Sequence, residues 1–167
     1  MKKLSLLLIL LVLILSGCGK SQDTINVSAD PKTHGFIFEV NGISIAMNEK
    51  AAPIIEKLGK PKAYFEADSC AFQGKEKTYT YNGFELHTYE KDKTDYTLSI
   101  IFLDDSVTTK EGITLSSSLS DVKKAYGDKF KQDKGLYTYE LDKSKLSFLI
   151  ENDEVTSVEY KAGDGSK

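Results

Sequence analysis

Short runs in which apolar and polar residues alternate recur along the chain, and Asn-Gly pairs join four of them. One pair, at 41–42, lies between two such runs within residues 36–47, and another, at 82–83, lies between runs within 77–90. Alternation places successive side chains on opposite faces of a strand, and Asn-Gly tolerates the positive φ angles of a type I′ turn. The sequence therefore predicts antiparallel hairpins over 36–47 and 77–90.

Two short helices are predicted between the strands. Residues 49–58 carry an apolar face after Asn48, which we expect to cap the helix, and Gly59 follows as a stop. The second helix is expected over 120–126, with Gly127 as its stop. Further strands are expected over residues 63–66, 70–72, 96–103, 136–141, 145–151 and 154–160. Nine Tyr and eight Phe, with no Trp, favour such aromatic-lined strands.

An internal repeat relates the two halves of this pattern. Gly42–Ile45 matches Gly112–Leu115, and Leu58–Lys60 matches Tyr126–Asp128. Each copy would be a short helix followed by a meander that needs one face covered. We therefore predict an α+β fold made of two tandem units, each a short helix packed on an antiparallel β-meander.

The N-terminal segment has the organisation of an export signal. Lys2 and Lys3 precede an almost unbroken apolar run over 4–15, which is too short for a membrane span of about 20 residues. The Leu-Ser-Gly-Cys sequence at 15–18 resembles the lipobox of bacterial lipoproteins. The resemblance implies cleavage before Cys18 and attachment of diacylglycerol and an N-acyl chain to that cysteine. The alternatives are an uncleaved N-terminal anchor and an ordinary secretory signal.

These features predict an extracytoplasmic lipoprotein, held by its lipid at the outer face of the bacterial cytoplasmic membrane. All 22 basic residues are Lys, which fits a Gram-positive-type host. The polar residues that follow the cysteine are expected to form a flexible tether. The expected division of the chain is a signal peptide over 1–17, a lipidated tether over 18–35, a first unit over 36–107, a second unit over 108–162 and a disordered tail over 163–167.

The charge of the chain bears on its partners. Cleavage before Cys18 removes two of the 22 Lys, and the remainder face 25 acidic residues, so the mature domain is acidic. Nucleic-acid binding needs clustered positive charge, and Arg is the preferred residue for phosphate and guanine. The composition therefore excludes nucleic acid as a partner and leaves the membrane, through the lipid, and envelope or secreted proteins.

The motifs of the second unit resemble a known superfamily of small lipoproteins. The relevant features are Gly112–Leu115, a Ser-rich N-cap, Asp121-Val122, and Tyr126-Gly127 before a Tyr-rich hairpin. This superfamily contains the SmpA/OmlA domain of the outer-membrane assembly machinery and the tandem-repeat β-lactamase inhibitor protein. The first unit, with Ser-Cys-Ala-Phe at 69–72, also resembles lipoproteins common in clostridia. The resemblance implies helices on one face of an antiparallel sheet and a non-enzymatic, protein-binding role, whereas the insertion at 63–74 departs from it.

Cys70 is the second chemically notable residue. Lipidation of Cys18 would leave it a free thiol, because the chain has only two cysteines. Its apolar neighbours favour a small buried core residue, and the alternatives are a reactive thiol or a disulfide link to another chain. A nucleophilic pair with His87 lacks an orienting group or an oxyanion motif, so no catalytic residue is assigned.

No metal or cofactor is expected. Zinc sites in proteins usually need four Cys or His ligands, and this chain offers two of each. Asp92, Asp95, Asp104 and Asp105 do not fit the spacing of a calcium loop. We expect them to be solvated turn charges.

Aromatic residues at alternate strand positions are the better candidates for a protein interface, since aromatic anchors dominate binding energy. The candidate set is Tyr79, Tyr81, His87, Tyr89, Tyr137 and Tyr139. Each of them could instead fill the core. The sequence thus predicts a membrane-anchored, non-enzymatic scaffold or inhibitor-like binding module. The alternative is an envelope enzyme or small-ligand receptor that uses Cys70 or the loop carboxylates.

Overall fold

The computed structural model of the protein describes residues 35–70 and 74–163. Its helices are α1 (Ala51–Leu58) and α2 (Leu119–Tyr126). Its strands are β1 (Ile37–Val40), β2 (Ile43–Ala46), β3 (Ala63–Asp68), β4 (Lys75–Thr80), β5 (Phe84–Lys91), β6 (Thr94–Phe102), β7 (Lys131–Asp133), β8 (Leu136–Leu141), β9 (Ser144–Glu151) and β10 (Glu154–Ala162).

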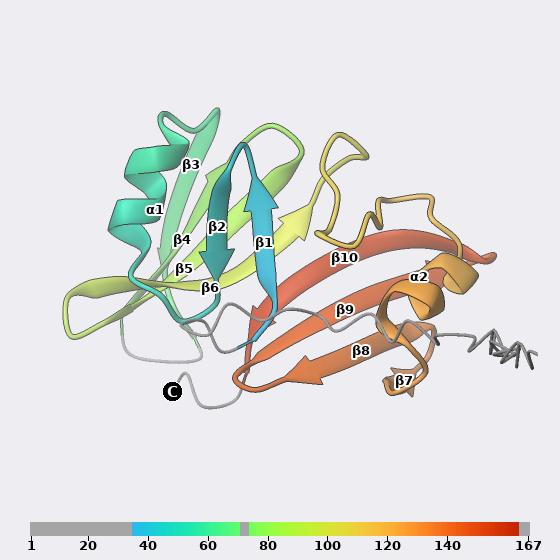
Figure 1. Cartoon of the computed structure of the whole chain (residues 1–167). Coiled ribbons are helices and arrows are strands. Elements are labelled where there is room, and N and C mark those ends of the chain that lie inside the picture. The colour runs from blue at the N-terminus through green and yellow to red at the C-terminus, as the bar shows by residue number, and fades with distance from the viewer. Residues whose placement is uncertain (1–34, 71–73, 164–167) are drawn as a thin grey trace, which may run out of the picture.

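Eight of the strands form a single antiparallel sheet in the order β3-β4-β5-β6-β10-β9-β8-β7, and β1 pairs with β2 apart from it. Figure 1 shows α1, the β1–β2 hairpin and α2 on the same face of this sheet. Strands account for 52% of the described residues and helix for 13%. The fold is therefore mostly β, a twisted sheet with one covered face.

The predicted α+β fold of two tandem helix-on-meander units is wrong. The strands that follow α1 and those that follow α2 join edge to edge, because β6 pairs directly with β10 at Ile100↔Tyr160. The proposed repeat also fails where it begins. Residues Ile43–Ala46 form strand β2, whereas the matching residues 112–115 form a loop. One sheet and one hydrophobic core thus replace two stacked units.

The hairpin predicted over 36–47 is confirmed, and it is the centre of the covering layer. Asn41 and Gly42 have φ angles of 51° and 75°, as a type I′ turn requires. Phe38 of β1 is fully buried and contacts three rings of the sheet. Its ring centroid lies 5.1 Å from Phe84, 5.4 Å from Phe102 and 5.7 Å from that of Tyr160. The hairpin therefore seals the seam between β6 and β10.

The cap predicted for the first helix is wrong. The N-cap of α1 is Lys50, without a side-chain hydrogen bond, and Asn48 lies before it at φ 65°. The Asn48 N–H donates to the Thr97 carbonyl at 2.9 Å, and Lys50 forms a β-bridge to Tyr96. The chain therefore extends the sheet over 48–50 before it can turn into a helix.

The second helix and most strands are confirmed within two residues at their ends. Helix α2 begins with a capping box in which Ser118 and Asp121 exchange hydrogen bonds between side chain and backbone. The short edge strand β7 was not expected. The strand predicted over 70–72 is not observed at Cys70, which lies in a bend, and residues 71–73 lie outside the described part of the chain.

Candidate functional site

Register divides the sheet into a covered row and an open row of side chains. The covered row runs through Tyr79, Leu86, Ile100, Tyr160, Leu146 and Tyr139. The neighbouring rows, on the opposite face, run through Thr78, His87, Ser99, Lys161, Lys145 and Glu140, and through Thr80, Glu85, Ile101, Glu159, Ser147 and Thr138. Side chains one position apart on a strand point to opposite faces, so these two rows share a surface. We call this surface the open face.

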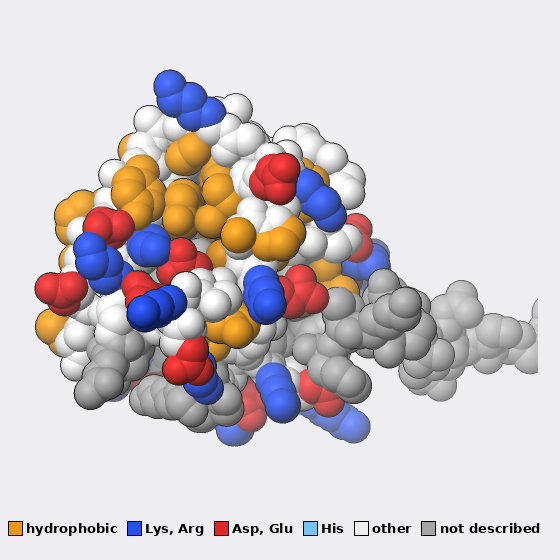
Figure 2. Space-filling model, turned by 90° about the vertical axis from the view of Figure 1, so that its left-hand side faces the viewer, with side chains coloured by type: hydrophobic (Ala, Val, Ile, Leu, Met, Phe, Trp, Pro, Cys, Tyr) orange, Lys and Arg blue, Asp and Glu red, His pale blue; other side chains and the backbone are white. Residues whose placement is uncertain are grey.

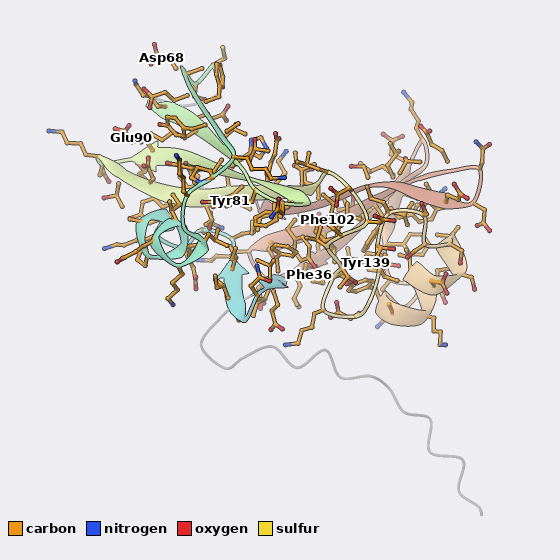
Figure 3. All side chains as sticks on the ribbon, turned by 90° about the horizontal axis from the view of Figure 1, so that it is seen from above. Phe36, Asp68, Tyr81, Glu90, Phe102 and Tyr139 are labelled. Carbon is orange, nitrogen blue, oxygen red and sulfur yellow. The ribbon has the colours of Figure 1, made fainter. Side chains whose placement is uncertain are left out.

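No helix or strand of the described residues covers the open face. In Figure 3, which views the molecule from above, α1, the β1–β2 hairpin and α2 lie together on the other side of the sheet. Asp68, at the end of β3, lies on the uncovered side, so the sheet curls towards its open face at this edge. Covered-row residues Ile100 and Leu146 are fully buried, whereas Glu140 and Lys161 across the sheet are exposed. Within the described residues the open face is therefore exposed at positions such as Glu140 and Lys161, while Ser99 and Ser147 on it are buried.

Hydrogen bonds hold the side chains of the open face near β4 and β5 in fixed positions. The Thr78 hydroxyl and the His87 Nδ1 lie 3.2 Å apart, and the His87 Nε2 lies 3.2 Å from a Glu85 carboxylate oxygen. The Thr80 hydroxyl donates to the other Glu85 oxygen at 3.3 Å. These groups are half-buried and satisfy one another. The surface is consequently ordered before any partner arrives, which lowers the entropy cost of binding.

The same pattern continues over the C-terminal strands. The hydroxyls of Thr138 and Ser147 lie 3.0 Å apart. Glu140 accepts from Lys131 at 2.7 Å and lies 3.9 Å from Lys145. Opposite charges on neighbouring strands suit a sheet face that meets water. Both signs of charge are present, so electrostatics alone selects neither an acidic nor a basic partner.

Apolar side chains interrupt this polar surface. Ile101 is half-buried in the middle of it, and Leu136 on β8 is 41% exposed. At the far edge Phe65 of β3 is 67% exposed and stands opposite Thr78. A mixture of apolar spots and ordered polar groups is the composition of a non-obligate protein interface.

Most of the aromatic residues predicted as an interface lie inside the protein. Tyr81, Tyr89, Tyr137 and Tyr139 are buried, with Tyr139 only 4% exposed. Tyr79 is half-buried against the core on the covered face. His87 and Tyr89, two positions apart on β5, both have the phase of the open face; His87 is half-buried there, and Tyr89 is buried with its ring against Tyr96. The structure therefore does not bring the six together on one surface.

Two of the buried tyrosines connect the sheet to the helix ends. The Tyr139 hydroxyl donates to the Gly127 carbonyl at 2.8 Å, just after α2, and the Tyr81 hydroxyl donates to the Gly59 carbonyl at 3.4 Å, just after α1. Burial raises the pKa of the Tyr139 phenol to about 12, so the hydroxyl stays protonated and able to donate. Their role is structural.

Replacement Tyr139→Phe is expected to lower the free energy of unfolding by about 1 kcal/mol, because it removes this hydrogen bond without changing the ring. Chemical denaturation followed by circular dichroism measures the change. Tyr137→Phe is the matched control, since its ring is also buried and no hydrogen bond of its hydroxyl is found within the described residues. That control should change stability by less than about 0.5 kcal/mol. Equal effects would contradict the assigned bond.

Cys70 does not have the buried position that its apolar neighbours predict. Cys70 is exposed and free, at the end of β3, so it is not the core residue that its neighbours favoured. His87 lies in the middle of β5 and is engaged with Thr78 and Glu85. Their separation on the sheet gives no support to a nucleophilic pair.

Two of the four candidate carboxylates, Asp95 and Asp104, have hydrogen-bond partners. Asp95 accepts from Lys77 at 2.7 Å. Asp104 accepts from the Ser106 backbone N–H at 2.9 Å, and its bonds to Ser106 hold the pKa of its carboxyl below the usual value. Among the described residues no group of three or more His, Cys, Asp or Glu is arranged to hold a metal ion. Asp95 and Asp104 therefore have structural partners.

A small cleft of about 150 Å³ opens beside the turn of the first hairpin. It is lined by Val40, Asn41, Leu58, Lys60, Lys62, Tyr81, Asn82 and Phe84. Pockets for metabolites usually enclose about 300–1,000 Å³. The cleft is therefore too small to support the small-ligand receptor.

The open face could have been found in the sequence as the opposite phase of the same alternation. Thr78 and Thr80 alternate with Tyr79 and Tyr81, and Thr138 lies between Tyr137 and Tyr139. Thr has a high strand propensity and a polar tip, so it suits a hydrated sheet face. Most of the aromatic residues predicted as an interface lie in the other phase, which faces the core.

A scan against protein-family models and searches among curated proteins and solved structures found no match to this chain. The resemblance to the SmpA/OmlA and β-lactamase-inhibitor superfamily therefore stays a prediction. No helix in the described part of the chain has the length and apolarity to cross a membrane. Cys18, the predicted lipid attachment site, lies outside the described residues.

Proposed function

We propose that the protein is a lipid-anchored, extracytoplasmic and non-enzymatic module that binds an envelope or secreted protein through the open face. The observation that carries this proposal is the uncovered face itself. All the covering elements of the described chain pack on the other face, and the open one bears ordered polar pairs around exposed apolar side chains. The lipid anchor rests on the sequence at 15–18.

A sheet face is suited to this task because its side chains are fixed by the backbone ladder. The row from Thr78 to Glu140 crosses six strands without a break in register. A partner would therefore meet a broad surface with little side-chain entropy left to lose. Among the described residues, Asp95 and Asp104 are engaged with Lys77 and Ser106 and Cys70 is exposed after β3, so their arrangement gives no support to catalysis.

Site-specific photo-crosslinking in the native cell tests the proposal. A benzophenone amino acid at Thr80 or Thr138, both on the open face, is expected to capture the same envelope or secreted protein. The matched controls carry it at Glu56 of α1 and Lys124 of α2, which are exposed on the covering layer. Captured proteins are compared by mass spectrometry. Equal capture from both layers, or none from the open face, would overturn the proposal.

A further inference from the structure

The two edges of the sheet are protected to very different degrees. β7 closes one edge with the three polar residues Lys131–Asp133. At the other edge β3 is twice as long, pairs with β4 alone among the described strands, and exposes all six of its residues. Natural sheets usually protect an edge with short strands or charged side chains, because a free strand edge pairs with other chains. β7 is short as well as polar, whereas β3 combines two charged residues, Glu66 and Asp68, with a longer strand and exposed aromatic side chains.

The exposed edge carries the two most exposed aromatic side chains of the described residues. Tyr64 is 50% exposed and Phe65 is 67% exposed, on opposite faces of β3. Figure 2 views the side of the molecule that carries α1 and β3, and hydrophobic side chains gather there. Tyr64 is held in place, since its ring centroid lies 5.0 Å from that of Tyr79 and its hydroxyl donates to Glu66 at 2.5 Å.

The hydrogen-bond pattern shows which backbone groups of β3 are available. The Ser69 N–H donates to the Gly74 carbonyl at 2.9 Å, so these two residues form a hydrogen-bonded pair. Such pairs alternate along an antiparallel ladder with pairs that exchange no bonds. By this alternation Phe65 bonds to β4, whereas the N–H and C=O groups of Tyr64 and Glu66 point towards the open edge.

We propose that β3 binds β3 of a second copy of this chain. The two strands run antiparallel, and the twofold axis that relates them passes midway between Phe65 and the partner's Phe65. In this register Phe65 stands opposite the partner's Phe65 as a close, non-hydrogen-bonded pair. Tyr64 and the partner's Glu66 then exchange backbone hydrogen bonds, which satisfies the outward groups of β3. The inference uses the edge of the sheet and does not rest on the function proposed for the open face.

Charge selects the second copy and this register. Lys62 directly precedes β3, where its N–H donates to the Thr80 carbonyl at 2.8 Å, so its positive charge would lie near the partner's Asp68 at the end of the paired strands, and the twofold axis repeats this proximity. Glu66 accepts from Lys75 at 2.5 Å, so its charge is already compensated. A register centred on Glu66 would instead place two glutamates opposite each other, which is unfavourable.

The dimer would have a consequence for binding. A twofold axis of this kind stands perpendicular to the sheet, so both open faces would lie on the same side of one continuous sheet. Two membrane-tethered copies would thus present a doubled surface in the same direction. A partner that binds both halves at once would be held more tightly than by one half, because the second binding event is intramolecular.

Disulfide trapping in the full-length chain tests the register, in a Cys70→Ser background where Cys18 is common to all samples. Phe65→Cys is expected to form a disulfide-linked dimer under mild oxidation, because opposite Cβ atoms lie about 4.5–5.5 Å apart. Ala63→Cys and Ala67→Cys should each stay monomeric, since their own copies lie about 14 Å apart along the strand. Mixing these two should give a heterodimer.

The outcomes separate the alternatives. A monomeric Phe65→Cys protein overturns the proposal. A dimer of Ala67→Cys alone shows a different register. If β3 pairs with another element such as β7, no introduced cysteine meets its own copy, and no disulfide-linked dimer forms. Both results would also contradict the proposed twofold pair.

A proline variant tests the outward backbone groups without disturbing β4. Glu66→Pro removes an N–H that points to the open edge, and proline is tolerated on edge strands. The dimer, measured by light scattering of the detergent-solubilised protein, is expected to be lost at an unchanged melting temperature. Glu66→Gln is the matched control: it also loses the charge pair with Lys75 but keeps the N–H, and it should remain dimeric. Persistence of the dimer in the proline variant would contradict the proposal.

Discussion

Phe38→Ala is expected to lower the free energy of unfolding by about 3–5 kcal/mol, the usual cost of truncating a buried phenylalanine. Phe38 has no exposed surface and packs against Phe84, Phe102 and Tyr160. Its loss opens a cavity over the seam where β6 meets β10, which is joined by only a few residue pairs. Small domains are stable by about 5–15 kcal/mol, so this single change should remove a large fraction of the total.

Urea denaturation followed by circular dichroism measures the effect. Phe65→Ala is the matched control, because the same atoms are removed from a side chain that is 67% exposed. It should change the stability of the monomer by less than about 0.5 kcal/mol. A similar loss in both variants would show that the hairpin does not anchor the covering layer.

Local signals in the sequence predicted most of the secondary structure. The turn at Asn41-Gly42 and the cap at Ser118 depend on residues that are close together in the chain, and both elements lie where the pattern indicates. The start of α1 was missed because a bridge to the distant strand β6 competes with the cap at Asn48. Tertiary pairing there overrides a local preference.

The joining of the strands into one sheet was not accessible from local patterns. β6 and β10 bring together residues such as Ile100 and Tyr160, which are far apart in sequence, and the alternation of each strand is the same whether it lies at an edge or in the centre. The match between 42–45 and 112–115 reflected common turn residues, because only the first of them forms a strand. Local patterns therefore predict two units, whereas the strands form a single sheet.

The candidate site is difficult to predict from the sequence for a different reason. A tyrosine has an apolar ring and a polar tip, so the sequence cannot decide whether Tyr139 fills a core or faces a partner. The structure resolves the choice through the carbonyl of Gly127, which accepts from the buried hydroxyl. Threonine and charged residues at the intervening positions then mark the open face, as at Thr138 and Glu140.

Cys18→Ser is expected to abolish both fatty-acid labelling and retention of the protein in the membrane fraction. The lipobox-like sequence at 15–18 provides the only thiol at the predicted cleavage point, and serine cannot form the thioether. Each buried methylene of an acyl chain contributes about 0.8 kcal/mol to membrane binding, so loss of all chains should release the protein almost completely. Labelling with a clickable fatty acid and cell fractionation measure the two effects.

Cys70→Ser is the matched control, because it removes the other cysteine of the chain, which is exposed at the end of β3. It should label and sediment as the wild type does. The melting temperature of Cys18→Ser should equal that of the wild type, since the hydrophobic core lies within residues 35–70 and 74–163. Labelling of Cys18→Ser at the wild-type level would show that the lipobox interpretation is wrong. Loss of label in Cys70→Ser alone would place the lipid on the folded domain and turn its β3 edge towards the membrane.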